Sequence, residues 1–248
     1  MRDRNIEVAV FRFFYTCCIV LCMENSTLYV VATPIGNLED ITLRALRILG
    51  EVDVIFCEDT RVTNRLLERH SLSAKLKSLN ARTEQGKTEE VIGHLKEGKN
   101  VAYVSDAGTP TVSDPGSMLV SAVREAGFKV EVIPGPSAVT AALSIIGVPA
   151  SEFLFLGFLP HKKGRQTLLK EIAESKRTVV LYESTHRILK LLDELEENLP
   201  VNWRVCIARE LTKVHEEVLC GSPEELRQAL TDNPQKQRGE FVVVIAPI

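Results

Sequence analysis

The sequence of 248 residues lacks both of the glycine-rich fingerprints that commonly hold nucleotide phosphates. It contains no G-x-G-x-x-G motif and no G-x-x-x-x-G-K-[ST] motif. These glycines let a backbone approach a pyrophosphate or triphosphate closely, so their absence argues against the usual dinucleotide and P-loop sites.

Cysteine is scarce, and no pair has the C-x-x-C spacing. Three of the six cysteines lie in the first 22 residues and three lie later: Cys17, Cys18 and Cys22, then Cys57, Cys206 and Cys220. The later three sit within or beside apolar runs. We therefore expect free thiols packed in a reducing cytosol, hence a cytoplasmic protein. No His/Cys ligand spacing indicates a metal.

An excess of positive charge is also missing. The chain has 30 Lys and Arg against 33 Asp and Glu, a net charge of -3 and a pI near 6.0. This balance argues against a protein that coats nucleic acid indiscriminately, so any RNA binding must use local basic patches. The apolar content of 45% is enough for a globular core.

No apolar run at the N-terminus is long enough to span a bilayer. The run from Phe13 to Cys22 has only ten residues, and no small-residue cleavage site follows it. We interpret residues 1–22 as an N-terminal extension outside the fold, with no membrane association; the alternative is a targeting segment.

From residue 28 onwards, short apolar runs alternate with helical patterns. In the first half, strands are expected at 28–32, 52–57, 100–105 and 128–133, and helices at 41–50, 63–70, 88–98, 117–127 and 138–147. The connections are short, which predicts parallel strands with right-handed crossovers. A polar connection is expected between residues 71 and 87.

The second half contains a hairpin-like element at 203–220, which predicts a mixed sheet there. Its strands are expected at 153–158, 177–183, 203–208, 215–220 and 240–247, and its helices at 166–175, 186–198 and 222–230. The predicted fold class is therefore α/β with two α/β domains, residues 23–148 and 149–248, the first mainly parallel and the second mixed.

The loop SDAGTPTVSDPG, residues 105–116, follows the strand at 100–105 and carries two acids, Asp106 and Asp114, but no Lys or Arg. Ligands of open parallel sheets bind outside the carboxyl ends of the strands. Phosphate is repelled by carboxylates, so this loop suits a neutral or positive ligand, such as an adenosine with a sulfonium group. Alternatively, the two acids only hydrogen-bond the loop and cap the next helix.

Eight sequence blocks occur in an order that resembles one known family. They are TPIGNLEDITLRAL, CEDTR, VSDAGTPTVSDPG, PGPSA, GFLP with HKKGR, YESTHR, ARELTK and RGEFVVV, and they cover residues 28–246. Together they resemble the tetrapyrrole methylase family, in its branch that methylates small-subunit ribosomal RNA. The resemblance implies two α/β domains, S-adenosylmethionine in a cleft between them, and a homodimer. It also implies 2′-O-methylation of a cytidine ribose in 16S rRNA of the small ribosomal subunit.

The resemblance also implies which residues hold the cofactor: Ile35, Asp106, Gly108, Thr109, Val112, Ser137, Ala138, Tyr182, Leu211 and Glu240. Related small-molecule methylases carry Gly-Asp-Pro where this chain has Gly108-Thr109-Pro110, so the acidic group moves to Asp106. Ordinary core packing is the alternative for Val112, Ala138 and Leu211. Ser137 could simply cap the following helix.

Methyl transfer to a ribose hydroxyl needs a group that accepts the hydroxyl proton. Glu58 and Arg61 in CEDTR follow a strand end and face the same rim as the loop 105–116, and Glu183 ends another strand. These three are the catalytic candidates, although Glu58, Asp59 and Arg61 could equally form a helix cap and an ion pair.

RNA binding would need cations near the strand ends. The candidates are Lys162, Lys163 and Arg165 in HKKGR and Arg187 in THRILK; their alternative is a solvated surface. Two rival functions stay open: a small-molecule methylase acting on a tetrapyrrole-like acceptor, and a non-catalytic ligand- or RNA-binding module.

Overall fold

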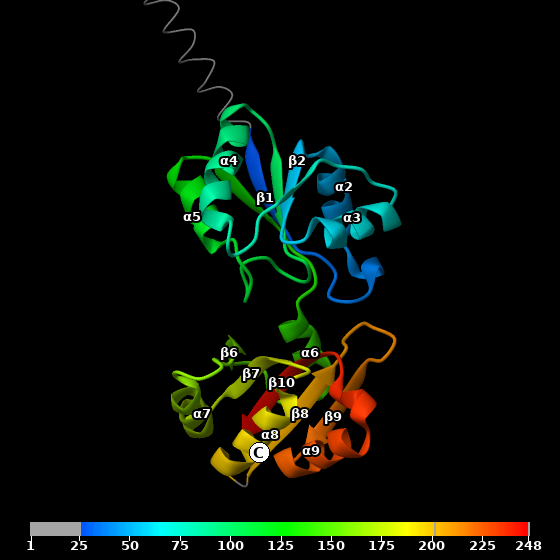
Figure 1. Cartoon of the computed structure of the whole chain (residues 1–248), viewed down its shortest axis with the longest axis vertical. Coiled ribbons are helices and arrows are strands. Elements are labelled where there is room, and N and C mark those ends of the chain that lie inside the picture. The colour runs from blue at the N-terminus through cyan, green and yellow to red at the C-terminus, as the bar shows by residue number, and fades with distance from the viewer. Residues whose placement is uncertain (1–25, 201, 248) are drawn as a thin grey trace, which may run out of the picture. The chain divides into compact units, whose positions relative to one another are not determined.

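The computed structural model describes residues 26–200 and 202–247 (Figure 1). The chain divides into two compact units, each built around its own sheet. The first contains the residues up to Pro34 and Leu38–Pro136, and the second contains Ile35–Asn37 and Ser137–Ile248. The predicted extension, residues 1–22, and the three cysteines in it lie outside the described residues.

The first unit is built on a five-stranded sheet in the order β3-β2-β4-β1-β5, and every pairing is parallel. Its strands are β1 (Thr27–Val31), β2 (Val54–Cys57), β3 (Leu76–Ser78), β4 (Val101–Val104) and β5 (Lys129–Ile133). The prediction of a mainly parallel sheet is confirmed. The prediction of a polar connection at 71–87 is wrong because it missed β3, a three-residue edge strand too short to show periodicity.

Helices cover both faces of this sheet (Figure 1). They are α2 (Leu43–Glu51), α3 (Thr60–Arg69), α4 (Glu84–Lys96) and α5 (Ser117–Glu125), with a short 3₁₀ turn η1 (Leu38–Asp40). Alternate residues of β2 serve the two faces: Ile55 packs with α2 and α3, whereas Phe56 packs with α4 and α5. Double coverage explains why β2 and β4 are apolar at every position.

The second unit has a mixed sheet, as predicted, and its five strands lie in the order β6-β7-β10-β8-β9. Its strands are β6 (Phe153–Phe158), β7 (Thr178–Ser184), β8 (Trp203–Arg209), β9 (Glu217–Gly221) and β10 (Glu240–Pro247). Only β6 and β7 are parallel; β10 runs antiparallel to β7 and β8, and β8 and β9 form the expected hairpin.

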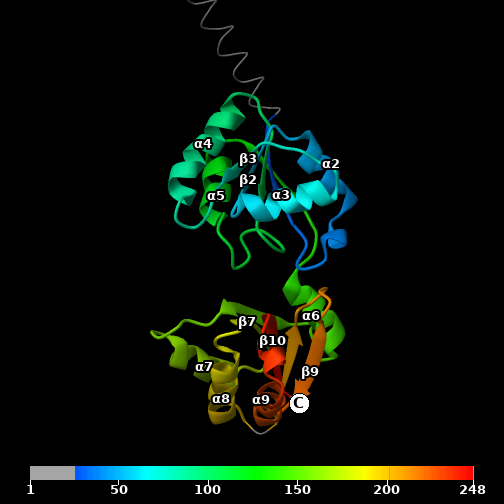
Figure 2. The ribbon, with the colours of Figure 1, turned by 45° about the vertical axis from the view of Figure 1, so that its right-hand side comes forward.

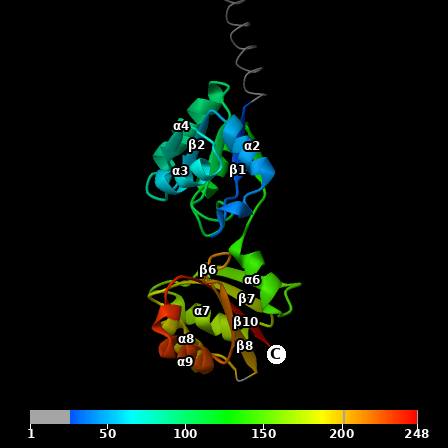
Figure 3. The same cartoon turned by 90° about the vertical axis from the view of Figure 1, so that its right-hand side faces the viewer.

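Three helices, α7 (Arg165–Glu174), α8 (Ile188–Asn198) and α9 (Pro223–Asp232), cover one face of the second sheet, and α6 (Ala138–Ile146) covers the other (Figures 2 and 3). A 3₁₀ turn, η2 (Pro234–Gln237), precedes β10. The domain boundary predicted after residue 148 differs from the structure by one helix. Val139, Ala142 and Ile146 of α6 pack against the second sheet, so the second unit begins at Ser137.

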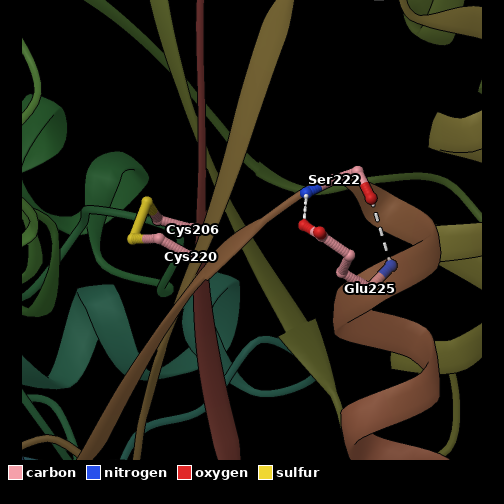
Figure 4. The surroundings of a disulfide bond; sticks show 4 residues. All are labelled: Cys206, Cys220, Ser222 and Glu225. Carbon is pink, nitrogen blue, oxygen red and sulfur yellow. Dashed lines mark hydrogen bonds between the residues drawn. A yellow bond between two sulfur atoms is a disulfide. The ribbon is translucent and has the colours of Figure 1, made fainter.

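The expectation that all described cysteines are free thiols is wrong. Cys206 on β8 lies directly opposite Cys220 on β9, and the two form a disulfide (Figure 4). The hairpin register brings them together over 14 residues of sequence, a pairing that their spacing alone did not reveal. Cys57 is a buried free thiol, as predicted.

The helix after this hairpin starts in the way its sequence predicts. Ser222 accepts a hydrogen bond from the Glu225 N–H, and the Glu225 carboxylate accepts one from the Ser222 N–H, which forms a capping box (Figure 4). Across residues 26–200 and 202–247, none of the helices combines the length and apolar character that crossing a membrane requires.

Candidate functional site

The carboxyl ends of β1 and β4 meet where the strand order of the first sheet reverses direction. Chain connections leave these two strands to opposite sides, and ligands of parallel α/β sheets bind at such a point. Thr33, after β1, and Gly108, after β4, exchange two backbone hydrogen bonds of 2.9 and 3.0 Å. The Thr33 hydroxyl also donates to the Ser105 carbonyl. These bonds fix the start of the loop 105–116 against the first strand.

The backbone of this loop is strained at several positions. Thr111 has a φ of 72° and Ser113 a φ of 63°, values that residues with a Cβ rarely adopt. Gly116 has a φ of 116°, and a Cβ there would lie 2.3 Å from the Tyr103 ring. Such strain persists only where the surroundings hold the backbone, and it concentrates at functional sites.

The far end of the loop is held by Glu84, a residue that the sequence reasoning missed. Its buried Oε1 accepts hydrogen bonds from the N–H groups of Gly116, Met118 and Leu119, at 3.0 to 3.1 Å. This carboxylate from α4 therefore caps α5, a role that the sequence analysis had offered to Asp106 and Asp114. No local pattern marks Glu84, because its partners are 32 or more residues away.

Three carboxyl groups gather beside this loop, and of these Asp106 alone is near a cation among the described residues, the Arg61 guanidinium. Burial, followed by the charges of Asp114 and Asp106, raises the pKa of Glu58 from 4.5 to about 7. Burial likewise raises the pKa of Asp114 from 3.8 to about 6, and it raises that of Asp106. Neither Glu58 nor Asp114 forms an ion pair with a described residue. The cluster is therefore poised to accept a cation or a proton.

Asp59 and Arg61 form the cap and ion pair that the sequence analysis gave as an alternative. Asp59 accepts from the Arg61 N–H at 2.9 Å and holds its guanidinium at 2.6 Å. This pairing lowers the pKa of Asp59 to about 2. The Asp59 N–H in turn donates to Asp106 Oδ1 at 3.0 Å, which ties the start of α3 to the acidic loop.

The other predicted cofactor residues of the first unit lie along the same loop. Gly108 is buried in the bridge to Thr33, and the Thr109 hydroxyl donates to the Pro136 carbonyl at 3.3 Å. The Val112 residue is 41% exposed, so the alternative of core packing is wrong for this residue.

The second unit brings four predicted cofactor residues into one apolar cluster. Ile35, Ala138, Tyr182 and Leu211 all belong to the core between α6 and the sheet. Leu211 is buried in this cluster, and Ala138 is partly buried against it. Ser137 stands at the N-cap of α6, but its side chain makes no capping hydrogen bond.

Glu240 lies at the start of β10, near this cluster. Its exposed carboxylate pairs with Lys213 at 3.0 Å, and its N–H donates to Glu210 at 3.0 Å. Glu210 has a φ of 50° and Thr212 a φ of 63°, so the turn carrying Leu211 is strained, like the acidic loop.

Tyr182 and Glu183 are neighbours on β7, so their side chains point to opposite faces of the sheet. The Tyr182 ring contacts Phe155 and Phe158 on the face that α6 covers. Glu183 points to the other face, where it is 2% exposed and paired with Arg187 at 2.8 Å. The structure therefore gives Glu183 surroundings that suit a structural anchor better than a catalytic base.

The four predicted RNA-binding residues also separate into two kinds. Lys162 and Lys163 are exposed and form no ion pair with a described residue. Arg165 is buried, 3% exposed, and paired with Glu194, and Arg187 is half-buried. Direct RNA contact fits the two lysines and not Arg165. In the part of the chain that the structure describes, no three His, Cys, Asp or Glu side chains are arranged to hold a metal.

Solved structures share this two-unit α/β architecture. The chain matches the methyltransferase CobJ with a TM-score of 0.69 at 19% identity, covering 90% of this chain and 94% of the other. It matches uroporphyrin-III C-methyltransferase from Thermus thermophilus, solved with S-adenosyl homocysteine, with a TM-score of 0.63 at 17% identity, covering 89% and 97%. At these identities the likeness shows the fold alone.

Sequence relatives are nearer. The family described as Tetrapyrrole (Corrin/Porphyrin) Methylases matches residues 27–227. Ribosomal RNA small subunit methyltransferase I of Neisseria meningitidis serogroup B is 47% identical over 90% of this chain and 77% of its own length. The proteins of the same name from Escherichia coli O157:H7 and Thermotoga maritima are 46% and 45% identical, over 90% and 88% of this chain and 78% and 97% of theirs. By these matches, this chain is a member of the tetrapyrrole methylase family, in the branch of the ribosomal RNA small subunit methyltransferases I.

Proposed function

We propose that the protein transfers a methyl group from S-adenosylmethionine to the ribose 2′-hydroxyl of a cytidine in 16S rRNA of the small ribosomal subunit. The observation that carries this proposal is the group of uncompensated carboxyls at the carboxyl ends of β2 and β4. The names of its relatives, at 45–47% identity, support the choice of RNA as substrate.

The residues of the acidic loop fit the methyl donor. S-adenosylmethionine carries a sulfonium and an ammonium against one carboxylate, so it is a net cation that stabilises ionised Asp106 and Asp114. A phosphate-bearing ligand would be repelled by the same groups. Gly108, Thr109 and Val112 would line the donor on this loop. In the second unit, the donor residues would be Ile35, Ser137, Ala138, Tyr182, Leu211 and Glu240.

Glu58 is the side chain best suited to accept the hydroxyl proton. When bound, the donor would supply an electrophilic methyl group to the ribose oxygen, with its own carbon–sulfur bond as the bond that is broken. The hydroxyl proton moves to the Glu58 carboxylate. With a pKa of about 7, Glu58 is partly ionised at neutral pH and still basic enough to take the proton. Arg61 acts through Asp59: it binds the Asp59 carboxylate, while the Asp59 N–H donates to Asp106 Oδ1.

The substrate side of the proposal rests on cations of the second unit. The exposed lysines Lys162 and Lys163 would contact RNA phosphates. We also propose that the protein acts as a homodimer and works in the cytoplasm, where ribosomal subunits are found. The disulfide between Cys206 and Cys220 removes the thiol argument for that location.

The experiment that tests the function uses labelled S-adenosylmethionine and small ribosomal subunits that lack the modification. Nucleotide mapping after the reaction should place the label on one cytidine ribose. A parallel reaction offers a tetrapyrrole acceptor in place of the subunits. Label on the tetrapyrrole alone would support the rival small-molecule methylase, and label on neither acceptor with intact donor binding would support a non-catalytic module.

A further inference from the structure

Two arginines and two glutamates form a compact ionic cluster between β7, α7 and α8. Arg165 Nε donates to both oxygens of Glu194, at 3.1 and 2.8 Å, and its Nη2 donates to Glu194 Oε2 at 2.6 Å. Arg187 Nε pairs with Glu183 Oε1 at 2.8 Å. The two pairs are linked, because Arg165 Nη2 lies 3.9 Å from Glu183 Oε2. We refer to these four residues as the arginine clamp.

The clamp is buried and its own four charges balance, while the exposed Lys190 lies 3.9 Å from Glu194 Oε1 at its edge. The side chains of Arg165 and Glu183 are 3% and 0% exposed, and those of Glu194 and Arg187 are 10% and 15% exposed. Buried charges of this kind persist only when they are paired, and here two positive charges meet two negative ones. Glu183 Oε2 has no hydrogen-bond partner among the described residues, so its nearest compensation is the Arg165 guanidinium.

Each arginine also makes one bond to the chain that leads into the basic loop. Arg187 Nη1 donates to the Leu159 carbonyl at 2.9 Å, and Arg165 Nη1 donates to the Pro160 carbonyl at 3.2 Å. The next four residues, 161–164, are exposed, and they return to the clamp because the Arg165 N–H donates to the Lys162 carbonyl. The loop with Lys162 and Lys163 is therefore anchored at both ends by the clamp.

We propose that Arg165, Arg187, Glu183 and Glu194 are positioning residues, which hold the loop 161–164 so that Lys162 and Lys163 meet RNA phosphates. The inference rests on the proposed RNA substrate. A flexible loop would lose conformational entropy when its lysines engage phosphates, whereas an anchored loop has already lost it on folding. The arginine N–H groups of the clamp donate to acceptors inside the protein, so the clamp affects RNA binding only through the position of the loop.

The first test keeps the charge and removes the geometry. Arg187→Lys retains a cation but cannot hold Glu183 and the Leu159 carbonyl together through a planar guanidinium. Binding to unmodified small ribosomal subunits should weaken about as much as in the Lys162→Ala/Lys163→Ala variant, and its salt slope should fall by roughly two. The matched control is Arg177→Lys, an exposed arginine paired with Glu152, which should bind as wild type.

The second test measures whether RNA affinity rises or falls. Glu183→Gln removes a negative charge, so electrostatics alone predicts tighter RNA binding, whereas positioning predicts weaker binding, by roughly threefold or more. Glu152→Gln, an exposed carboxylate in the same unit, is the control and should not weaken binding. Tighter binding of Glu183→Gln would overturn the clamp.

Amide hydrogen exchange at Arg165, whose N–H donates to the Lys162 carbonyl, monitors the closure of the loop without RNA. It should speed up in Arg187→Lys and Glu183→Gln at temperatures where both remain folded. If Arg187→Lys unfolds, Glu183→Gln with the exchange measurement still decides.

A combined variant, Arg187→Lys with Lys162→Ala and Lys163→Ala, separates the two proposals. If the clamp acts through the lysines, the combined loss of affinity equals that of the lysine variant alone. Additive losses would overturn the clamp. No loss in the lysine variant itself would instead reject the proposed RNA surface, whatever the clamp does to loop exchange.

Discussion

Carboxyl groups lie near the strand ends of both units, but the two units treat them in opposite ways. In the first unit, Glu58 and Asp114 are partly buried and have no ion-pair partner among the described residues, and the pKa of each is raised. In the second unit, Glu183 and Glu194 are more deeply buried, and arginines neutralise them.

The difference indicates a functional role for the carboxyls without an ion-pair partner and a structural role for the paired ones. A carboxyl that is buried without a partner destabilises the fold when ionised, so it is kept where a ligand or a proton transfer makes use of it. A carboxyl neutralised inside the protein has its partner already and serves to hold segments in place. Sequence position alone placed Glu58 and Glu183 in the same class; their surroundings do not.

The largest expected effect is on catalysis by the uncompensated group. Glu58→Gln should lower the methylation rate by about 10²–10⁴-fold, because a carboxamide cannot accept the hydroxyl proton. Single-turnover methylation of small ribosomal subunits measures the rate, and calorimetry should show donor affinity within about threefold of wild type. Glu51→Gln, an exposed carboxylate of the same unit, is the control. A Glu58→Gln enzyme with a normal rate would contradict the assignment.

Next in size is the loss of the buried cap. Glu84→Ala leaves the N–H groups of Gly116, Met118 and Leu119 without their acceptor, so the free energy of unfolding should fall by about 2–4 kcal/mol. Urea denaturation measures it. Glu89→Ala, on the exposed side of the same helix, should stay within about 0.5 kcal/mol of wild type. Equal stability of the two variants would show that the cap contributes nothing.

A smaller effect links donor binding to pH. Ionised Glu58 and Asp114 attract the cationic donor, and their pKa values of about 7 and 6 mean that both lose their protons between pH 5 and 8. Affinity for S-adenosylmethionine should therefore rise roughly tenfold over that range, with proton release visible as a buffer-dependent heat. The variant Glu58→Gln/Asp114→Asn should flatten the profile. A flat profile in the wild-type protein would refute the electrostatic account of the loop.

The smallest effect concerns the stability of the protein without ligand. Because the folded-state pKa of Glu58 is raised, its contribution to stability is present below about pH 4.5 and is lost as the pH rises towards 7. Asp114 acts in the same direction between about pH 3.8 and 6. Denaturation midpoints measured across this range should decline less in Glu58→Gln than in wild type. A steeper decline in the variant would contradict the prediction that ionisation of Glu58 destabilises the fold.

Much of the fold could be predicted from local patterns. A few neighbouring residues are enough to predict the strands VIFC and VAYV and the helix start SPEE. Burial on both faces gives a continuous apolar run, and helix capping depends on residues within one turn. The sequence did not predict β3, because three residues at a sheet edge are too few to show an alternating hydrophobic pattern. The disulfide between Cys206 and Cys220 was not predicted, because it depends on the register in which β8 and β9 pair.

The candidate site divides in the same way. The acidic composition of residues 105–116 predicted a site without phosphate, and the order of the sequence blocks identified the family. Neither could reveal that Glu84 caps α5, that Arg165 is buried, or that Glu183 pairs with Arg187.

By itself, the sequence determined every described strand except β3 and the absence of cations in the loop after β4, since both are properties of neighbouring residues. Only the tertiary structure decided which carboxylates form ion pairs with arginine and which have no such partner and remain available to a ligand. A charge acquires its partner from segments far away in sequence, and its pKa from how much water the packed structure leaves around it.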